Sequence, residues 1–108
     1  MRWRLFFSLL VVGCHSHAPK GDVSGILALE RDSTAGEAIF TETCALSRCH
    51  GSTGLNGSAP GLDTAVPHAD DPYLASVIRY GAGDMPAQTQ LNDQEIADVM
   101  GYVRQRFP

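Results

Sequence analysis

Residues 44–50 read Cys-Ala-Leu-Ser-Arg-Cys-His, which places the thiols of Cys44 and Cys49 and the imidazole of His50 in one short run. Two cysteines followed directly by a histidine are the pattern for covalent haem attachment, in which each thiol adds across one vinyl group of the porphyrin. The common spacing has two residues between the cysteines, whereas four lie between them here. Because the vinyl groups are a fixed distance apart, the two extra residues must loop out of the run.

The same run permits a second interpretation. In an exported protein, two cysteines this close can form a disulfide, and the histidine beside them can be an ordinary surface residue. A haem-free, disulfide-containing protein therefore remains the alternative for residues 44–50.

The first residues of the chain predict export. Arg2 and Arg4 give a basic start, and the apolar run at 5–12 is too short to span a bilayer. The run ends in Val-Val-Gly-Cys at 11–14, which resembles the lipobox of bacterial lipoproteins. The resemblance implies a signal peptide at 1–13, cleavage before Cys14 and a diacylglycerol on its sulfur. The alternative is a plain hydrophobic leader with an incidental cysteine.

The three cysteines of the chain can then all be assigned. Cys14 takes the lipid, and Cys44 and Cys49 take haem, so no thiol is left unpaired in an oxidising compartment. Removal of residues 1–13 takes away Arg2 and Arg4, which leaves six basic residues against twelve acidic ones. A chain this acidic is a poor partner for nucleic acid, and we expect none.

The rest of the chain is organised as a tether at 14–31 and one small domain at 32–108. Three helices and no alternating strand pattern predict an all-α fold. The first helix is expected to begin near Thr34, with Glu37 completing a capping box, and to carry the apolar positions Gly36, Ile39, Phe40 and Thr43. Residues 26–29 of the tether are apolar enough to dock on this domain.

The second and third helices have their own boundary signals. The second is expected to start with Asp71 as its cap and Pro72 in its first turn, and to end before Gly81. The third is expected to start at Asn92 with Glu95 three residues on, and Leu91 and Ile96 are spaced for a hydrophobic staple. The apolar face of the third helix comprises Ile96, Val99, Met100, Val103 and Phe107, with Tyr102 at its edge.

Two loops lie between these helices. Residues 51–61 are rich in glycine and include Pro60, and they are long enough to wrap a bound group. Residues 79–86 read Arg-Tyr-Gly-Ala-Gly-Asp-Met-Pro, and Pro86 favours an extended backbone at Met85. A methionine in a loop is out of place as core filler, and its thioether suits iron that must be stable as Fe(II).

Together these segments resemble class I cytochrome c over residues 29–108. The features shared are the haem-attachment motif after a Gly-x-x-x-Phe helix, the Gly/Pro loop, the Gly-x-Gly-x-Met-Pro segment and a last helix with Tyr102. The resemblance implies one covalent haem c, with His50 and Met85 as the two axial ligands of its iron. It further implies that the first and third helices cross where Gly36 and Phe40 meet Tyr102. It also suggests that the carbonyl of Pro60 accepts a hydrogen bond from the far ring nitrogen of His50.

The function expected from this site is electron transfer and not catalysis. Iron ligated on both faces has no open position for substrate, so a one-electron Fe(III)/Fe(II) couple remains. The expected partners are redox proteins, and the lipid on Cys14 would hold the domain to a membrane on the periplasmic side of a bacterial envelope. A haem-based sensor or a weak peroxidase with a labile Met85 is the competing class.

Several other residues have a functional and a structural interpretation. Met100 could rival Met85 as ligand, but its place on a helical stripe favours packing. His15 and His17 could bind adventitious metal, and His68 is expected in a solvated loop. Tyr73, Tyr80 and Arg79 could approach the haem or its propionates, or serve ordinary packing and surface roles.

Overall fold

The structure is a computed structural model that describes residues 19–108. Cys14, the expected signal peptide, His15 and His17 lie outside the described residues. Within them the chain forms, in order, α1 (Ser24–Leu27), α2 (Ser33–Ile39), a π-helical turn η1 (Phe40–Cys44), α3 (Leu62–His68), α4 (Asp71–Tyr80) and α5 (Asp93–Arg106). The predicted all-α class is confirmed for this part of the chain, where an isolated bridge between Ala82 and Met85 is the only strand-like pairing.

Helix α2 begins two residues earlier than predicted. Its cap is Asp32, whose carboxylate accepts hydrogen bonds from the backbone amides of Thr34 and Ala35. The amide of Asp32 in turn donates to the carboxylate of Asp98 on α5, at 2.9 Å. The predicted capping box of Thr34 and Glu37 was therefore wrong, because a longer-range contact with α5 fixes Asp32 as the residue at which the helix starts.

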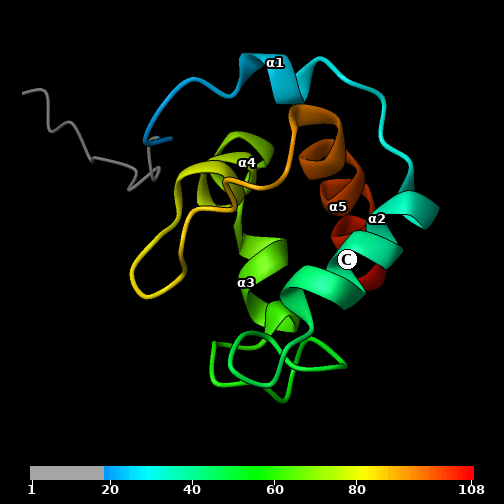
Figure 1. The fold of residues 1–108 in the computed structure, drawn as a ribbon, viewed down its shortest axis with the longest axis vertical. Coiled ribbons are helices and arrows are strands. Elements are labelled where there is room, and N and C mark those ends of the chain that lie inside the picture. Colours follow the sequence, from blue (N-terminus) through cyan, green and yellow to red (C-terminus); the bar gives the residue numbers. More distant parts are fainter. Residues whose placement is uncertain (1–18) are drawn as a thin grey trace, which may run out of the picture.

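Helices α2 and α5 cross closely, as expected (Figure 1). Gly36 is buried at the crossing, and a Cβ atom there would overlap the backbone carbonyl of Asp98. One turn further on, the rings of Phe40 and Tyr102 are in contact, with centroids 5.3 Å apart. The absent side chain at Gly36 thus allows the two helices to approach until these rings meet.

The second and third predicted helices are present as α4 and α5, and the N-cap of α4 lies one residue earlier than predicted. In α4 the cap is Asp70, which accepts from the amide of Tyr73, so Asp71 is the first helical residue and not the predicted cap. The helix ends at Tyr80, and Gly81 follows as its C-cap with a positive φ (79°), as the sequence predicts. In α5 the capping box of Asn92 and Glu95 is formed in both directions.

The core lies along α5 and extends to the N-terminal segment. Val23 and Ile26 are buried against α4 and α5, so residues 23–29 of the expected tether pack on the domain. The backbone amide of Lys20 donates to the hydroxyl of Ser76, which attaches the chain to α4 from that residue onward. The buried apolar residues are Val23, Ile26, Phe40, Leu62, Val66, Ala75, Ile78, Leu91, Ile96, Ala97, Val99, Met100, Val103 and Phe107.

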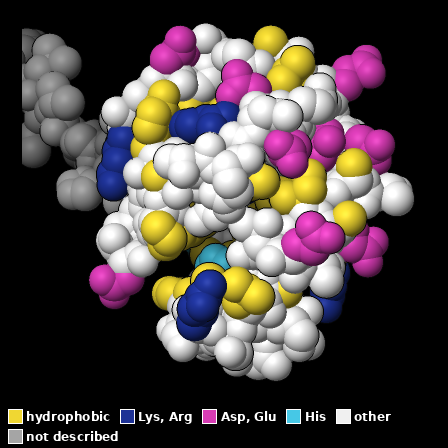
Figure 2. All heavy atoms as spheres, in the orientation of Figure 1, with side chains coloured by type: hydrophobic (Ala, Val, Ile, Leu, Met, Phe, Trp, Pro, Cys, Tyr) yellow, Lys and Arg dark blue, Asp and Glu magenta, His cyan; other side chains and the backbone are white. Residues whose placement is uncertain are grey.

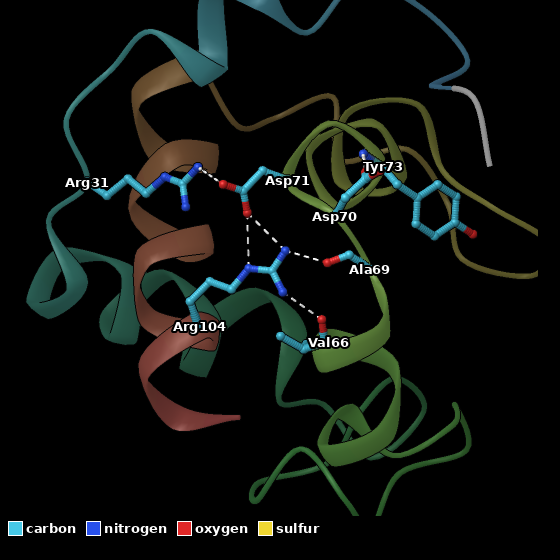
Figure 3. Close-up of polar contacts among 7 residues, drawn as sticks. All are labelled: Arg31, Val66, Ala69, Asp70, Asp71, Tyr73 and Arg104. Carbon is cyan, nitrogen blue, oxygen red and sulfur yellow. Dashed lines mark hydrogen bonds and ion pairs between the residues drawn. The ribbon is translucent and has the colours of Figure 1, made fainter. Parts of the chain in front are cut away.

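Helix α3 was not predicted, and it contains Pro67, which cannot donate a backbone hydrogen bond within the helix. Arg104 of α5 compensates for this irregular end by donating to the carbonyls of Val66 and Ala69 (Figure 3). The same guanidinium pairs with one carboxylate oxygen of Asp71 at 2.9 Å, while Arg31 binds the other oxygen. One cluster of charges therefore joins α3, α4, α5 and the segment before α2.

Candidate functional site

The attachment run begins in a widened helical turn. Helix α2 passes directly into η1, where the amide of Ala45 donates to the carbonyl of Phe40, five residues back. Such π-helical turns are rare and occur mostly as single turns, frequently at functional sites. This widened turn delivers Cys44 to the start of the loop.

The two extra residues between the cysteines form a tight turn. The carbonyl of Leu46 accepts hydrogen bonds from the amides of Cys49, at 2.8 Å, and Gly51, at 3.0 Å. The amide of His50 donates to the carbonyl of Cys44 at 3.1 Å, which closes the loop at its base. The residues between the cysteines therefore turn back on themselves, as the fixed spacing of the vinyl groups requires.

A second segment, residues 57–59, holds this turn from outside. Amides of Gly57, Ser58 and Ala59 donate to the carbonyls of His50, Ser47 and Cys49 respectively, at 3.2, 3.1 and 2.8 Å. A Cβ on Gly57 would lie 2.5 Å from the carbonyl carbon of His50, so no side chain fits there. The sequence predicted only that residues 51–61 wrap a bound group. The glycine at position 57 is the feature of the sequence that could have indicated this close approach to the turn.

Both thiols of the run are free in the structure. Burial, followed by repulsion from Cys49, raises the pKa of the Cys44 thiol to about 11. Cys44 also packs against the hydrophobic core, so its surroundings favour a neutral sulfur. A thioether, the product of addition to a vinyl group, is a neutral sulfur of this kind.

The imidazole of His50 is partly buried, and its Nδ1 is fully buried without a hydrogen-bond partner among the described residues. Burial lowers the pKa of His50, and the backbone of Pro60 acts in the opposite direction. The carbonyl of Pro60 is therefore near the ring, but the expected hydrogen bond to Nδ1 is not formed. A neutral imidazole keeps a lone pair on one ring nitrogen, so His50 can serve as a ligand through Nε2.

Met85 lies in a tight turn that follows α4. Ala82 and Met85 exchange two backbone hydrogen bonds, at 2.9 and 3.0 Å, and Gly81 and Gly83 both take positive φ. The amide of Gln88 then donates to the carbonyl of Ile78, which fixes the return of the loop to α4. The side chain of Met85 is partly buried and packs against the same core cluster as Cys44. The two loops expected to face the haem thus share one core.

The face of the molecule in Figure 2 is hollowed between its upper and lower parts. A histidine side chain lies in this hollow, and hydrophobic side chains and one basic side chain surround it. A groove of about 300 Å³ between α2 and α5 is lined by Thr34, Glu37, Tyr102 and other residues, and none of the residues that line it belongs to the attachment run or to the loop of Met85.

The remaining candidates have structural partners. Met100 is completely buried on α5, which confirms that it is core packing. Arg79 donates to the carbonyl of Leu91 and pairs with Asp93, so its charge is already compensated within the protein. The hydroxyl of Tyr80 donates to the carbonyl of Asp22. His68 is exposed at the end of α3 and not in a loop as predicted.

Residues 31–103 match the family model described as cytochrome C oxidase, cbb3-type, subunit III. The chain belongs to the cytochrome c family. It is 30% identical over 82 residues to a cytochrome c-553-like protein of Synechocystis sp., and this match covers 76% of each chain.

Solved cytochromes share the fold. Cytochrome c6 of the diatom Phaeodactylum tricornutum has a TM-score of 0.53 and 32% identity, covering 67% of this chain and 90% of that one. Cytochrome cL of Methylophaga aminisulfidivorans has a TM-score of 0.59 and 32% identity, covering 80% of this chain and 57% of that one. Cytochrome cL of Hyphomicrobium denitrificans has a TM-score of 0.56 and 29% identity, with 80% and 50% covered.

Membership of this family fixes the chemistry at the coarse level. The protein carries one covalently bound haem c with its iron, and it is an electron carrier and not an enzyme. The free thiols, the partly buried imidazole of His50 and the partly buried methionine described above fit this group. In residues 19–108, no helix is both long enough and apolar enough to cross a membrane.

Proposed function

We propose that this cytochrome is a membrane-tethered electron carrier whose haem is attached to Cys44 and Cys49 and ligated by His50 and Met85. The observation that carries the proposal is the hydrogen-bonded turn of residues 44–51. It holds two free thiols and a neutral, partly buried imidazole in one rigid loop. The amide of His50 is bonded to Cys44 and its carbonyl to Gly57, so the backbone of the turn fixes the position of the histidine.

Each segment of the site has a separate part in this proposal. The turn of residues 44–51 and its clasp at 57–59 orient His50. The loop of residues 81–88 would present Met85 to the iron as its second ligand. Pro60 would accept a hydrogen bond from Nδ1 of His50 after a small adjustment, and this bond would fix the tautomer in which Nε2 is free to ligate.

When bound, the haem supplies a one-electron Fe(III)/Fe(II) couple, whose potential a thioether ligand and an apolar pocket raise. Each cycle takes one electron from a reduced donor protein and gives one to an oxidised acceptor. Contacts with such partners would be small and transient, because the carrier must release each partner after transfer. Charged side chains would therefore serve the rate and orientation of encounter more than its affinity.

The proposed anchor is a lipid on Cys14, which places the domain on the periplasmic face of a bacterial membrane. The backbone amide of Lys20 is bonded to Ser76, and Lys20 follows Cys14 by six residues in the sequence. A segment of that length spans at most about 20 Å. Such a short connection would keep the domain near membrane-bound donors and raise their effective concentration.

Visible spectra of the purified, matured protein test this function. We expect a low-spin haem c spectrum in both redox states and no stoichiometric binding of carbon monoxide by the reduced protein, because both axial positions are filled. Rapid, stoichiometric carbon monoxide binding would contradict the closed site and favour a sensor. Colourless protein would favour a disulfide between Cys44 and Cys49.

A further inference from the structure

We propose that residues 20–27 form a strap that fixes the loop of Met85, and that Tyr80 is the positioning residue through which the strap acts. The inference rests on the proposed function, because it concerns the loop that carries the second axial ligand. The strap keeps this loop closed, so that other ligands rarely replace the thioether of Met85 on the iron. Below, residues 20–27, which end with α1, are called the strap.

The first observation is that the strap lies along the last turns of α4. The backbone amide of Lys20 donates to the hydroxyl of Ser76 at 2.8 Å. The carbonyl of Asp22 accepts a hydrogen bond from the hydroxyl of Tyr80 at 2.9 Å. Between these bonds, the backbone of Gly21 lies against the ring of Tyr80, since a Cβ at Gly21 would be 2.5 Å from Cζ of that ring. Three consecutive residues of the strap therefore contact two side chains that are one helical turn apart.

The second observation is that the strap also reaches the start of α5. Val23 and Ile26 are buried, which fixes the strap on the core. A Cβ at Gly25 would lie 3.2 Å from a carboxylate oxygen of Asp93, and Asp93 pairs with Arg79 of α4. Figure 1 shows α1 above the start of α5, in agreement with this contact. The strap thus meets α4 where the loop of Met85 begins and α5 where the chain after that loop ends.

The third observation is that Tyr80 is coupled to Met85 through a single residue. Gly81 follows Tyr80, and a Cβ at Gly81 would lie 2.6 Å from the carbonyl oxygen of Met85. Ala82 and Met85 then exchange two backbone hydrogen bonds. A displacement of Tyr80 is therefore transmitted to the backbone of Met85 by close contacts, with no loose segment between them.

The exposure of Tyr80 supports this role. Its side chain is 41% exposed, so burial of the ring accounts for only part of what it contributes. Its specific contacts are those with Gly21 and Asp22 of the strap. The free energy needed to open a loop depends on the contacts at its ends, so loss of this contact should raise the population in which the loop is open.

Imidazole binding to the oxidised, matured protein tests the strap. One sulfur–iron bond breaks, one nitrogen–iron bond forms, and the iron remains Fe(III). The apparent dissociation constant of imidazole is larger than the intrinsic one by the inverse of the fraction of protein in which the loop is open. We expect Tyr80→Phe, which removes the hydroxyl and keeps the ring, to lower this constant on the order of tenfold. Exchange of the backbone amides of Ala82 and Met85 with deuterium, followed by NMR, should become faster by a similar factor.

Tyr102→Phe is the matched control, because it removes the same atom from a tyrosine on α5 and keeps the ring that contacts Phe40. We expect it to change the dissociation constant by less than about twofold. Ser76→Ala, which removes the bond to Lys20, should act in the same direction as Tyr80→Phe and replaces it if that variant does not mature.

The Met85→Ala background separates positioning from a general loosening of the fold. Without the thioether there is no ligand to position, so adding Tyr80→Phe to Met85→Ala should change imidazole binding by less than about twofold. An effect that persists in this background would overturn the inference, because Tyr80 would then act independently of Met85.

The remaining outcomes distinguish the strap from the proposed function. If Met85→Ala binds imidazole more tightly than wild type but Tyr80→Phe does not, or if Tyr80→Phe and Tyr102→Phe shift binding equally, the strap is overturned and the ligand stands. If Met85→Ala leaves imidazole binding unchanged, Met85 is not the ligand, and the proposed ligation fails together with the strap.

Discussion

His50 illustrates how much a single residue depends on its neighbours. Its backbone amide and carbonyl are both bonded, to Cys44 and Gly57, while Nδ1 remains buried and unpaired. An unpaired buried nitrogen is unfavourable, so we expect Nδ1 of His50 to pair with the carbonyl of Pro60 in the matured protein. That bond would leave Nε2 as the ring nitrogen available to a ligand.

At the residue scale, Met85→Ala is expected to lower the reduction potential while the haem stays attached. The thioether favours Fe(II), and its loss opens one face of the iron. The reduced variant should bind carbon monoxide, whereas Met100→Leu, a change of a buried core methionine, should leave the potential nearly unchanged. Potentiometric titration of both variants is the measurement. An unaltered potential and spectrum in the Met85 variant would exclude Met85 as ligand.

Gly57→Ala is expected to disturb the attachment loop, because a Cβ there meets the backbone of His50. We expect a loss of stability of about 1–3 kcal/mol, as for other overpacked positions, and a lower yield of attached haem. Ser58→Ala is the matched control, because it removes only the long hydroxyl contact to Ser47 and keeps the backbone bond. Equal yields of haem protein in the two variants would show that the clasp is unimportant.

At the scale of elements, the sequence predicted helices better than their starts. Asn92 was located correctly because its capping box is local, with both partners within three residues. The start of α2 was misplaced because Asp32 is fixed by Asp98, 66 residues away, and no local pattern shows such a contact. Helix α3 was missed because Arg104 supports its end from α5.

For the attachment site, the sequence predicted the chemistry but not the backbone geometry. The residue types at 44–50 indicated the chemistry, and the spacing showed that two residues had to loop out. The π-helical turn and the clasp at 57–59 could not be predicted, because they depend on backbone hydrogen bonds that any residue type could make. Only glycine at 57, where a Cβ does not fit, leaves a trace in the sequence.

Gly36→Ala tests the helix crossing. A Cβ would overlap the carbonyl of Asp98, so α2 and α5 must move apart and the contact of Phe40 with Tyr102 must loosen. We expect a loss of about 3 kcal/mol in the free energy of unfolding, measured with denaturant. Gly25→Ala in α1, where the nearest atom is a flexible carboxylate of Asp93, should change stability by much less. Similar losses at both positions would contradict a close crossing at Gly36.

At the scale of the whole molecule, one charge cluster connects distant segments. Burial alone would raise the pKa of the Asp71 carboxyl, but hydrogen bonds and charge from Arg31 and Arg104 outweigh it and hold that pKa below its usual 3.8. A carboxyl with a lowered folded-state pKa stabilises the fold above its unfolded pKa. That contribution is lost as the pH falls through the folded value.

The stability of wild-type protein should therefore decline below about pH 4 partly through Asp71. Asp71→Asn should be less stable than wild type at neutral pH, and the difference should shrink in acid. Denaturant titrations of both proteins between pH 7 and pH 2.5 measure this. A difference that is independent of pH would show that the cluster acts through hydrogen bonds alone.

The proposed anchor is also a property of the whole molecule. Cys14→Ala should move the protein from the membrane to the soluble fraction with its haem unchanged, because no other lipid site is proposed. Fractionation and haem staining provide the measurement. Continued retention in the membrane would contradict lipidation at Cys14.

The central claim, that one haem bridges Cys44 and Cys49, can be tested by trypsin and mass spectrometry. Arg48 lies between the two cysteines, so cleavage after Arg31, Arg48 and Arg79 separates residues 32–48 from residues 49–79. We predict that, after reduction with a thiol, the two peptides stay joined with the added mass of one haem, because thioether bonds resist such reduction. Two separate peptides without porphyrin would contradict the account.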